Sequence, residues 1–122
     1  MNVRRLTRGL SYLGDVTGKR QTYHVFRGSD FYLVLSFSRA KPRAGNFNVV
    51  EVDEVDRVRA RFGGRRGVTA KDVAAKRKGS RRGLGALPAL NVLYVLAALG
   101  DARIDTRRSG PRLFFNIKSS RA

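Results

Sequence analysis

Residues 84–100, LGALPALNVLYVLAALG, carry no charge in a chain where nearly a third of the residues are charged. A segment this apolar in so polar a chain must be buried. It is shorter than the about 20 apolar residues that a membrane-spanning helix needs, and Pro88 and Asn91 interrupt it. Pro88 suits the first turn of a helix, and Gly100 suits the residue after its last turn. The sequence therefore predicts the central helix of a small soluble domain, from about residue 87 to residue 99.

The charge of the chain is strongly unbalanced. Its 122 residues, enough for one domain with a real core, include 26 Lys and Arg against 9 Asp and Glu, a net charge of +17. Cations flank the apolar segment, because residues 63–82 carry a net charge of +7 and residues 101–122 one of +4. Twenty of the cations are arginines, whose planar guanidinium binds phosphates through paired hydrogen bonds. Genome composition or growth temperature could enrich arginine, but the scarcity of acids favours a polyanionic partner, with nucleic acid first.

Several classes of chemistry find no support in the sequence. The chain has no cysteine, which excludes disulfides and thiolate chemistry, and its single histidine, His24, has no visible partners for a metal site or a catalytic triad. The acidic cluster at residues 51–56 could serve a metal-dependent nuclease, but helix capping and pairing with nearby arginines explain it. The glycine-rich basic loops at 63–67 and 78–85 do not match a phosphate-loop pattern. We therefore expect no enzymatic activity, no metal and no cofactor.

The first half of the chain predicts an antiparallel β-sheet. Residues 20–27 and 31–38 are rich in β-branched and aromatic residues and flank a turn at residues 28–30, which is typical of a β-hairpin. A basic turn at 39–45 leads to a third strand over 46–52. The opening residues, MNVRRLTRGLSYL, predict a basic arm or a first structural segment, with a transit peptide as the alternative; no apolar signal run follows the start.

Aromatic side chains alternate with cations in the predicted hairpin. Tyr23 and Tyr32 are the aromatic residues that we expect to be exposed, because strand alternation cannot bury every aromatic side chain on one face. Exposed aromatic rings among cations could stack unpaired bases. The alternative is that most of these rings form the core.

The second half predicts three helices and a terminal hairpin. Asp53 can cap a first helix whose apolar positions are Val55, Val58 and Phe62, and two glycines end it at residue 63. Thr69 and Asp72 have the spacing of a capping box that opens a second helix at residue 70, between the apolar residues Val68 and Val73. This helix should end near residue 78. After the apolar helix come two strand-like runs, ARID and RLFFNIK, joined by a basic turn at 106–111.

This order of elements, with the T-x-x-D-V-A segment and the closing R-R-x-G-P-R hairpin, resembles the winged-helix DNA-binding superfamily over about residues 53–118. The resemblance implies that the third helix enters the major groove, the second crosses the backbone and the hairpin forms a wing. It assigns Lys71, Lys76, Arg77 and Lys78 to the second helix or just after it, Arg81 and Arg82 to the turn, and Arg107, Arg108 and Arg112 to the wing.

The third helix departs from this pattern. It offers base edges only Asn91 and Tyr94, although an asparagine can pair bidentately with adenine. The alternative is that this helix packs beneath the N-terminal sheet or against a second subunit. Binding is then weakly specific and runs through phosphates.

Together these observations predict an α+β fold, with a basic arm and antiparallel meander over residues 1–52 and a winged-helix-like unit over residues 53–122, either separate or as one compact unit. We expect a cytoplasmic protein, nucleoid-associated if prokaryotic, that binds double-stranded DNA as a regulator or architectural protein, touches no membrane and is free to form a homodimer. The alternatives are an RNA- or ribosome-associated protein and a single-stranded DNA-binding protein. The predicted contact residues are Arg39, Lys41, Arg43, Arg65, Arg66, Lys71, Lys76, Arg77, Lys78, Arg81, Arg82, Asn91, Arg107, Arg108 and Arg112.

Overall fold

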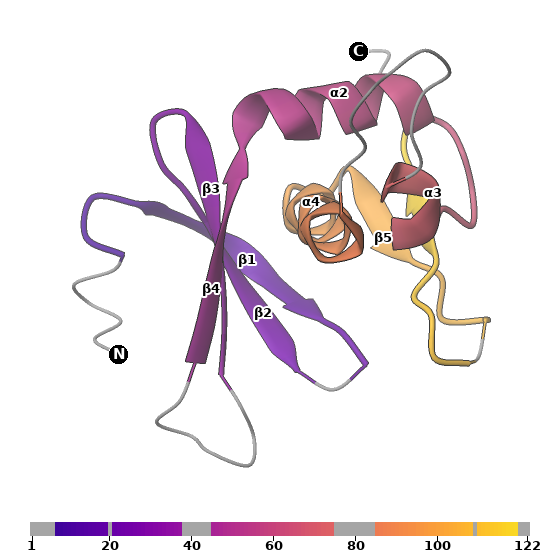
Figure 1. Cartoon of the computed structure of the whole chain (residues 1–122), viewed down its shortest axis with the longest axis horizontal. Helices are drawn as coiled ribbons and strands as arrows, with labels where there is room; N and C mark the ends of the chain where they lie inside the picture. Colours follow the sequence, from indigo (N-terminus) through magenta and orange to yellow (C-terminus); the bar gives the residue numbers. More distant parts are fainter. Residues whose placement is uncertain (1–6, 20, 38–44, 75–84, 109, 120–122) are drawn as a thin grey trace.

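The structure is a computed structural model that describes residues 7–19, 21–37, 45–74, 85–108 and 110–119. Its first half is a four-stranded antiparallel sheet in which the strands follow one another in chain order (Figure 1). The strands are β1 (Ser11–Thr17), β2 (Thr22–Arg27), β3 (Phe31–Phe37) and β4 (Gly45–Glu51). The predicted α+β class and the antiparallel N-terminal sheet are therefore confirmed.

The sequence does not identify strand β1: its first three residues fall in the opening segment, predicted as a basic arm or a first structural segment, and residues 14–17 carry no predicted element. Its pairing with β2 is irregular, because the register shifts between Tyr12 and Gly14. A bulge of this kind breaks the alternation by which a strand is identified in a sequence. The end of the opening segment, residues 11–13, therefore belongs to an edge strand of the sheet.

The two faces of the sheet have different surroundings. Val25, Val34 and Val50 lie on the face that joins the main core. On the other face, Tyr12, Phe26, Leu33 and Val49 form a row across the four strands, and Tyr12 and Val49 are 58% and 60% exposed. The prediction that Tyr32 is exposed is wrong, because this side chain lies on the core side at 3% exposure.

Helix α4 (Ala86–Ala98) is the centre of the molecule. It contacts all four strands of the sheet on one side and α2, α3 and β5 on the other, as Figure 1 shows. Every residue from 91 to 96 is buried. The predicted buried helix is confirmed, with each end within one residue of the prediction, and Gly100 follows it with a φ of 81°. No helix among the described residues is long and apolar enough to cross a membrane.

Helix α2 (Val52–Phe62) follows β4 without a loop. Val55, Val58 and Phe62 are buried as predicted, and the helix ends at Gly63. The predicted cap is wrong: Glu51 occupies the cap position without a side-chain hydrogen bond, and Asp53 lies in the first turn. Acids near the N-terminus and arginines near the C-terminus still suit the helix dipole.

The capping box of the short helix α3 (Ala70–Ala74) is confirmed. The backbone N–H of Thr69 donates to Oδ2 of Asp72 (2.9 Å), and the N–H of Asp72 donates to Oγ1 of Thr69 (3.2 Å). Val68 and Val73 on either side are both buried. The predicted end of this helix near residue 78 lies outside the described residues.

The chain closes with β5 (Ala102–Ile104) and β6 (Phe115–Ile117), which pair antiparallel. An isolated bridge between Val68 and Phe115 ties the segment before α3 to β6. One hydrophobic cluster contains residues of the first sheet, of all three helices and of β5 and β6. The segments 1–52 and 53–122 therefore share a core built around α4.

Candidate nucleic-acid interface

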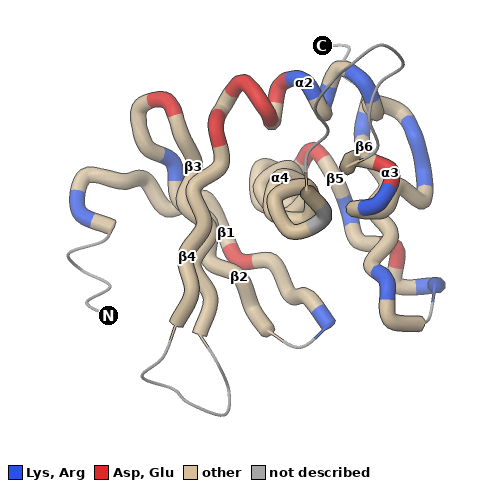
Figure 2. The backbone as a smooth tube through the Cα atoms, viewed as in Figure 1, with Lys and Arg blue, Asp and Glu red and all other residues tan. Residues whose placement is uncertain are grey.

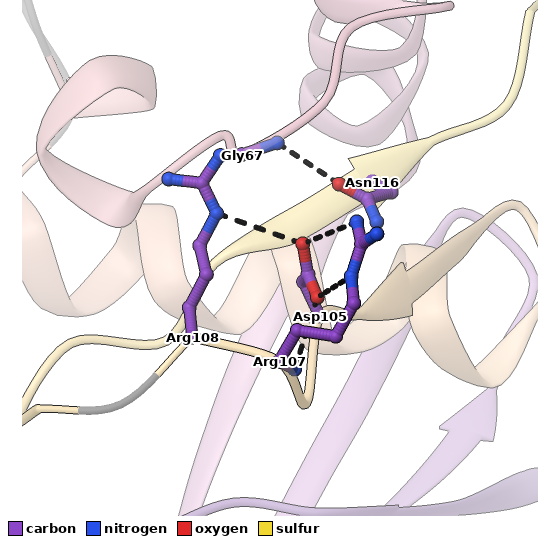
Figure 3. A network of polar contacts seen from close by, with 5 residues as sticks. All are labelled: Gly67, Asp105, Arg107, Arg108 and Asn116. Atoms are coloured by element: carbon purple, nitrogen blue, oxygen red, sulfur yellow. Dashed lines mark hydrogen bonds and ion pairs between the residues drawn. The ribbon is translucent and has the colours of Figure 1, made fainter.

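The loop between β5 and β6 is organised around one carboxylate. Asp105 has a side chain only 5% exposed, and Arg107 donates to it from Nε (3.0 Å to Oδ1) and Nη2 (3.1 Å to Oδ2). The backbone N–H of Arg107 also donates to Oδ1 (3.1 Å). Figure 3 shows Asp105 between Arg107 and Arg108. The Arg107 side chain is thereby oriented while remaining 74% exposed.

Hydrogen bonds from Arg107, and the charges of Arg107 and Arg108, lower the pKa of Asp105 to about 2. The carboxylate is therefore ionised at neutral pH. It offsets one of the two arginine charges and holds both side chains to the loop. The loop keeps a net positive charge whose position is set by the fold.

Arg108 joins this loop to the loop between α2 and α3. Its Nε lies 3.5 Å from Oδ2 of Asp105, and its guanidinium lies 4.7 Å from the ring centroid of Phe114. On its other side it meets Gly67, where an added Cβ would lie 2.8 Å from Nη2 of Arg108. The N–H of Gly67 donates to Oδ1 of Asn116 (2.9 Å), which ties the α2–α3 loop to strand β6, next to the β5–β6 loop (Figure 3).

The α2–α3 loop presents two further arginines. Arg65 and Arg66 are exposed, and the guanidinium of Arg65 lies 5.3 Å from the ring centroid of Phe62. Both line a hollow of about 360 Å³ together with Gly67. Stacking on Phe62 orients Arg65 without neutralising it.

Lys71 on α3 and Arg112 on the β5–β6 loop are exposed, and both line a second, larger cleft. Figure 2 shows the cations gathered at the end of α2, along the following loop, on α3 and on the β5–β6 loop. Acids gather at the start of α2, and single acids, Asp72 and Asp105, lie among the cations on α3 and at the β5–β6 loop. On α2, Arg57 pairs with Glu54 (3.2 Å) and Arg59 with Asp56 (2.9 Å), so much of that helix surface is neutralised.

Comparisons of this chain with protein-family models, with curated proteins and with solved structures found no match.

The predicted contact residues fall into three groups according to where the structure places them. Six lie on the surface formed by the two loops and α3, which we call the basic surface: Arg65, Arg66, Lys71, Arg107, Arg108 and Arg112. The prediction that Asn91 contacts nucleic acid is wrong, because this side chain is buried in the core at 2% exposure and its Nδ2 donates to the carbonyl oxygen of Leu87 (3.1 Å). The remaining predicted residues lie outside the described residues: Arg39, Lys41, Arg43, Lys76, Arg77, Lys78, Arg81 and Arg82.

Sequence reasoning missed the residues that organise these cations. The role of Asp105 could have been predicted, because an acid two residues before an arginine in a turn can accept a hydrogen bond from that arginine. The hydrogen bond between Gly67 and Asn116 could not, because the two residues are 49 positions apart in the chain.

His24, the single histidine, has a structural role in the sheet. Its Nδ1 lies 2.7 Å from Oδ1 of Asp15, which also accepts from the hydroxyl of Tyr12 (2.6 Å). These hydrogen bonds lower the pKa of Asp15 and raise the pKa of Tyr12. Among the described residues there is no cluster of three or more histidines or acids that could hold a metal ion.

Proposed function

We propose that this protein is a non-enzymatic DNA-binding protein that contacts the phosphates of double-stranded DNA through the basic surface. The observation that carries this proposal is the contact of Arg108 with Gly67, which joins the cations of the two loops. The six cations of the basic surface are exposed on the α2–α3 loop, on α3 and on the β5–β6 loop. These three segments lie on one side of the molecule, away from the acidic start of α2 (Figure 2). A cluster in which cations outnumber acids is the electrostatic footprint of a polyanion-binding surface.

The order of elements supports a winged-helix-like arrangement of residues 52–117. Helices α2, α3 and α4 and the hairpin of β5 and β6 follow one another in the order on which the resemblance to that superfamily rests. In such an arrangement the β5–β6 loop would correspond to the wing. Helix α4, which would read bases in that superfamily, is instead covered by the N-terminal sheet.

Burial of α4 decides the mode of binding that we propose. With Asn91 in the core, the described part of the basic surface consists of arginines and one lysine on loops and on α3. Such side chains bind phosphates regardless of base sequence. We therefore propose weakly sequence-specific binding, as in an architectural protein, with an affinity that depends on counterion release and falls with salt.

The single-stranded alternative would use the exposed aromatics of the sheet. The outer face carries Tyr12 and Phe47, 58% and 53% exposed. The described strand residues of that face include no Lys or Arg, whereas single-strand binders combine stacking rings with a basic groove. This favours duplex DNA and the basic surface.

A competition titration tests the proposal. Labelled duplex DNA, single-stranded DNA and structured RNA of equal length are titrated with the protein at two salt concentrations. We expect duplex DNA to bind about tenfold more tightly than the others at the higher salt, with log K falling by about 0.9 per phosphate contact for each tenfold rise in salt. Preference for structured RNA would replace the proposal with the RNA-associated alternative. Preference for single strands would move the interface to the sheet.

A further inference from the structure

The larger cleft combines an apolar interior with cations at its rim. It has a volume of about 440 Å³ and lies between the β1–β2 turn, helices α3 and α4, and the β5–β6 loop. This volume is within the range of small-molecule sites, which are about 300 to 1,000 Å³. Its interior is lined by Tyr23, Leu90 and Leu113, and its cations are Lys19, Lys71 and Arg112.

A pair of stacked tyrosines forms one wall of the cleft. The rings of Tyr23 and Tyr94 lie 4.1 Å apart at an angle of 22°. Burial and a hydrogen bond with Tyr23 raise the pKa of Tyr94, so the phenol is neutral. Gly18 closes over both rings, because an added Cβ would lie 2.9 Å from Cε2 of Tyr23 and 3.1 Å from Oη of Tyr94. The half-buried Tyr23 is therefore a fixed aromatic surface.

The three cations reach the cleft from separate parts of the chain. Lys19 lies in the β1–β2 turn, Lys71 on α3 and Arg112 on the β5–β6 loop, and all three are exposed. No ion pair joins any of them to an acid among the described residues, and the residues that line the cleft include no Asp or Glu. Three uncompensated charges around one hollow favour an anion there.

We propose that this cleft binds one nucleoside monophosphate unit, with the base against Tyr23 and the phosphate between the three cations. The lining supplies both chemistries that such a unit needs, an aromatic and apolar surface for a flat base and cations for a phosphate. Contact with the phosphates of a duplex needs only the cations and makes no use of the aromatic and apolar lining. The unit comes either from a free nucleotide or from an unpaired nucleotide at the end of a strand, so the proposal goes beyond the duplex contact proposed above.

Lys19 allows a test that separates this site from the basic surface, because it lines the cleft but lies outside the two loops and α3. The probe is adenosine 5′-monophosphate, titrated into the full chain by calorimetry, with adenosine and ribose 5-phosphate as probes that lack the phosphate or the base. We expect saturable binding of one adenosine 5′-monophosphate per chain and at least about tenfold weaker binding of both partial probes. Lys19→Gln should weaken binding by about tenfold, the effect of removing one charge-assisted hydrogen bond. Arg8→Gln, which removes an exposed charge that does not line the cleft, should not change it.

The source of the nucleotide is tested with two duplexes, one blunt and one with a single unpaired 3′ nucleotide. If the duplex with the overhang binds more tightly than the blunt duplex, and Lys19→Gln abolishes this difference, the cleft binds the end of a strand. If adenosine 5′-monophosphate binds but the two duplexes bind equally, the cleft binds a free nucleotide. Equal affinity for ribose 5-phosphate and adenosine 5′-monophosphate would overturn the proposal, since the base would then contribute nothing. So would the absence of both nucleotide binding and an overhang preference. Blunt-duplex affinity measured alongside tests the proposed function separately.

Discussion

Gly67 and Arg108 occupy adjoining space: a Cβ added at residue 67 would lie 2.8 Å from Nη2 and 3.0 Å from Cζ of Arg108. Gly67 also has a φ of 68°, in the left-handed region that side chains disfavour. Glycine is therefore suited to residue 67 for two reasons, its backbone conformation and the guanidinium that lies against it. This contact sets the position of Arg108 within the basic surface.

Gly67→Ala should weaken both stability and duplex binding. The left-handed backbone costs an alanine about 1 to 2 kcal/mol, and the new methyl displaces Arg108. Gly64→Ala is the matched control, because Gly64 has a φ of 84° and nothing within 4 Å of an added Cβ. We expect similar losses in urea unfolding for both variants and weaker duplex binding for Gly67→Ala alone. Equal affinities in the two variants would contradict the role given to Arg108.

The Asp105 carboxylate predicts a pH dependence of stability. Its pKa is lowered from 3.8 to about 2 by hydrogen bonds from Arg107. Ionised Asp105 therefore stabilises the folded protein at every pH above about 4, the pKa of this carboxyl in the unfolded chain. This contribution to the free energy of unfolding is lost as the pH falls from about 4 toward 2, where Asp105 is protonated in the folded protein as well. Asp105→Asn should be less stable than the wild type at pH 7, and the difference should shrink toward pH 2. Urea unfolding at several pH values measures it, and a constant difference across this range would contradict the assignment.

Two leucines of α4 test the burial of the helix. Leu93 is fully buried and Leu87 is 62% exposed. Leu93→Ala should cost about 2 to 5 kcal/mol of unfolding free energy because it leaves a cavity in the core. Leu87→Ala, the same change near the start of the same helix, should stay within about 0.5 kcal/mol. A small loss at Leu93 would contradict the packing of α4 beneath the sheet.

Removing cations that bind phosphates should flatten the salt dependence of duplex binding. The double variant Arg66→Gln, Arg112→Gln removes two exposed cations of the basic surface. We expect weaker binding and a slope of log K against log salt that is shallower by about 0.9 for each phosphate that the variant no longer neutralises. The control Arg8→Gln, Arg57→Gln removes the same charge outside that surface. Fluorescence anisotropy at four salt concentrations measures both, and equal slopes would show that net charge alone governs binding.

Local patterns account for what could be predicted. Thr69 and Asp72 cap α3 through neighbours three residues apart, and the apolar run of α4 has to be buried wherever the chain folds. The hairpin of β2 and β3 follows from β-branched residues on either side of a short turn. Each of these depends on interactions within a few residues, which is the range over which a sequence pattern carries physical information.

Long-range packing accounts for the rest. Local spacing and composition were enough to predict strands β2, β3 and β4, the three helices, the capping box and the excess of cations, but not the bulged strand β1. Three other relationships exist only in the folded chain: Asn91 lies in the core, Arg108 lies against Gly67, and Tyr23 stacks on Tyr94 at a cleft with three cations. Those relationships join residues far apart in the chain, and they arise because α4 brings the sheet and the terminal hairpin onto one core.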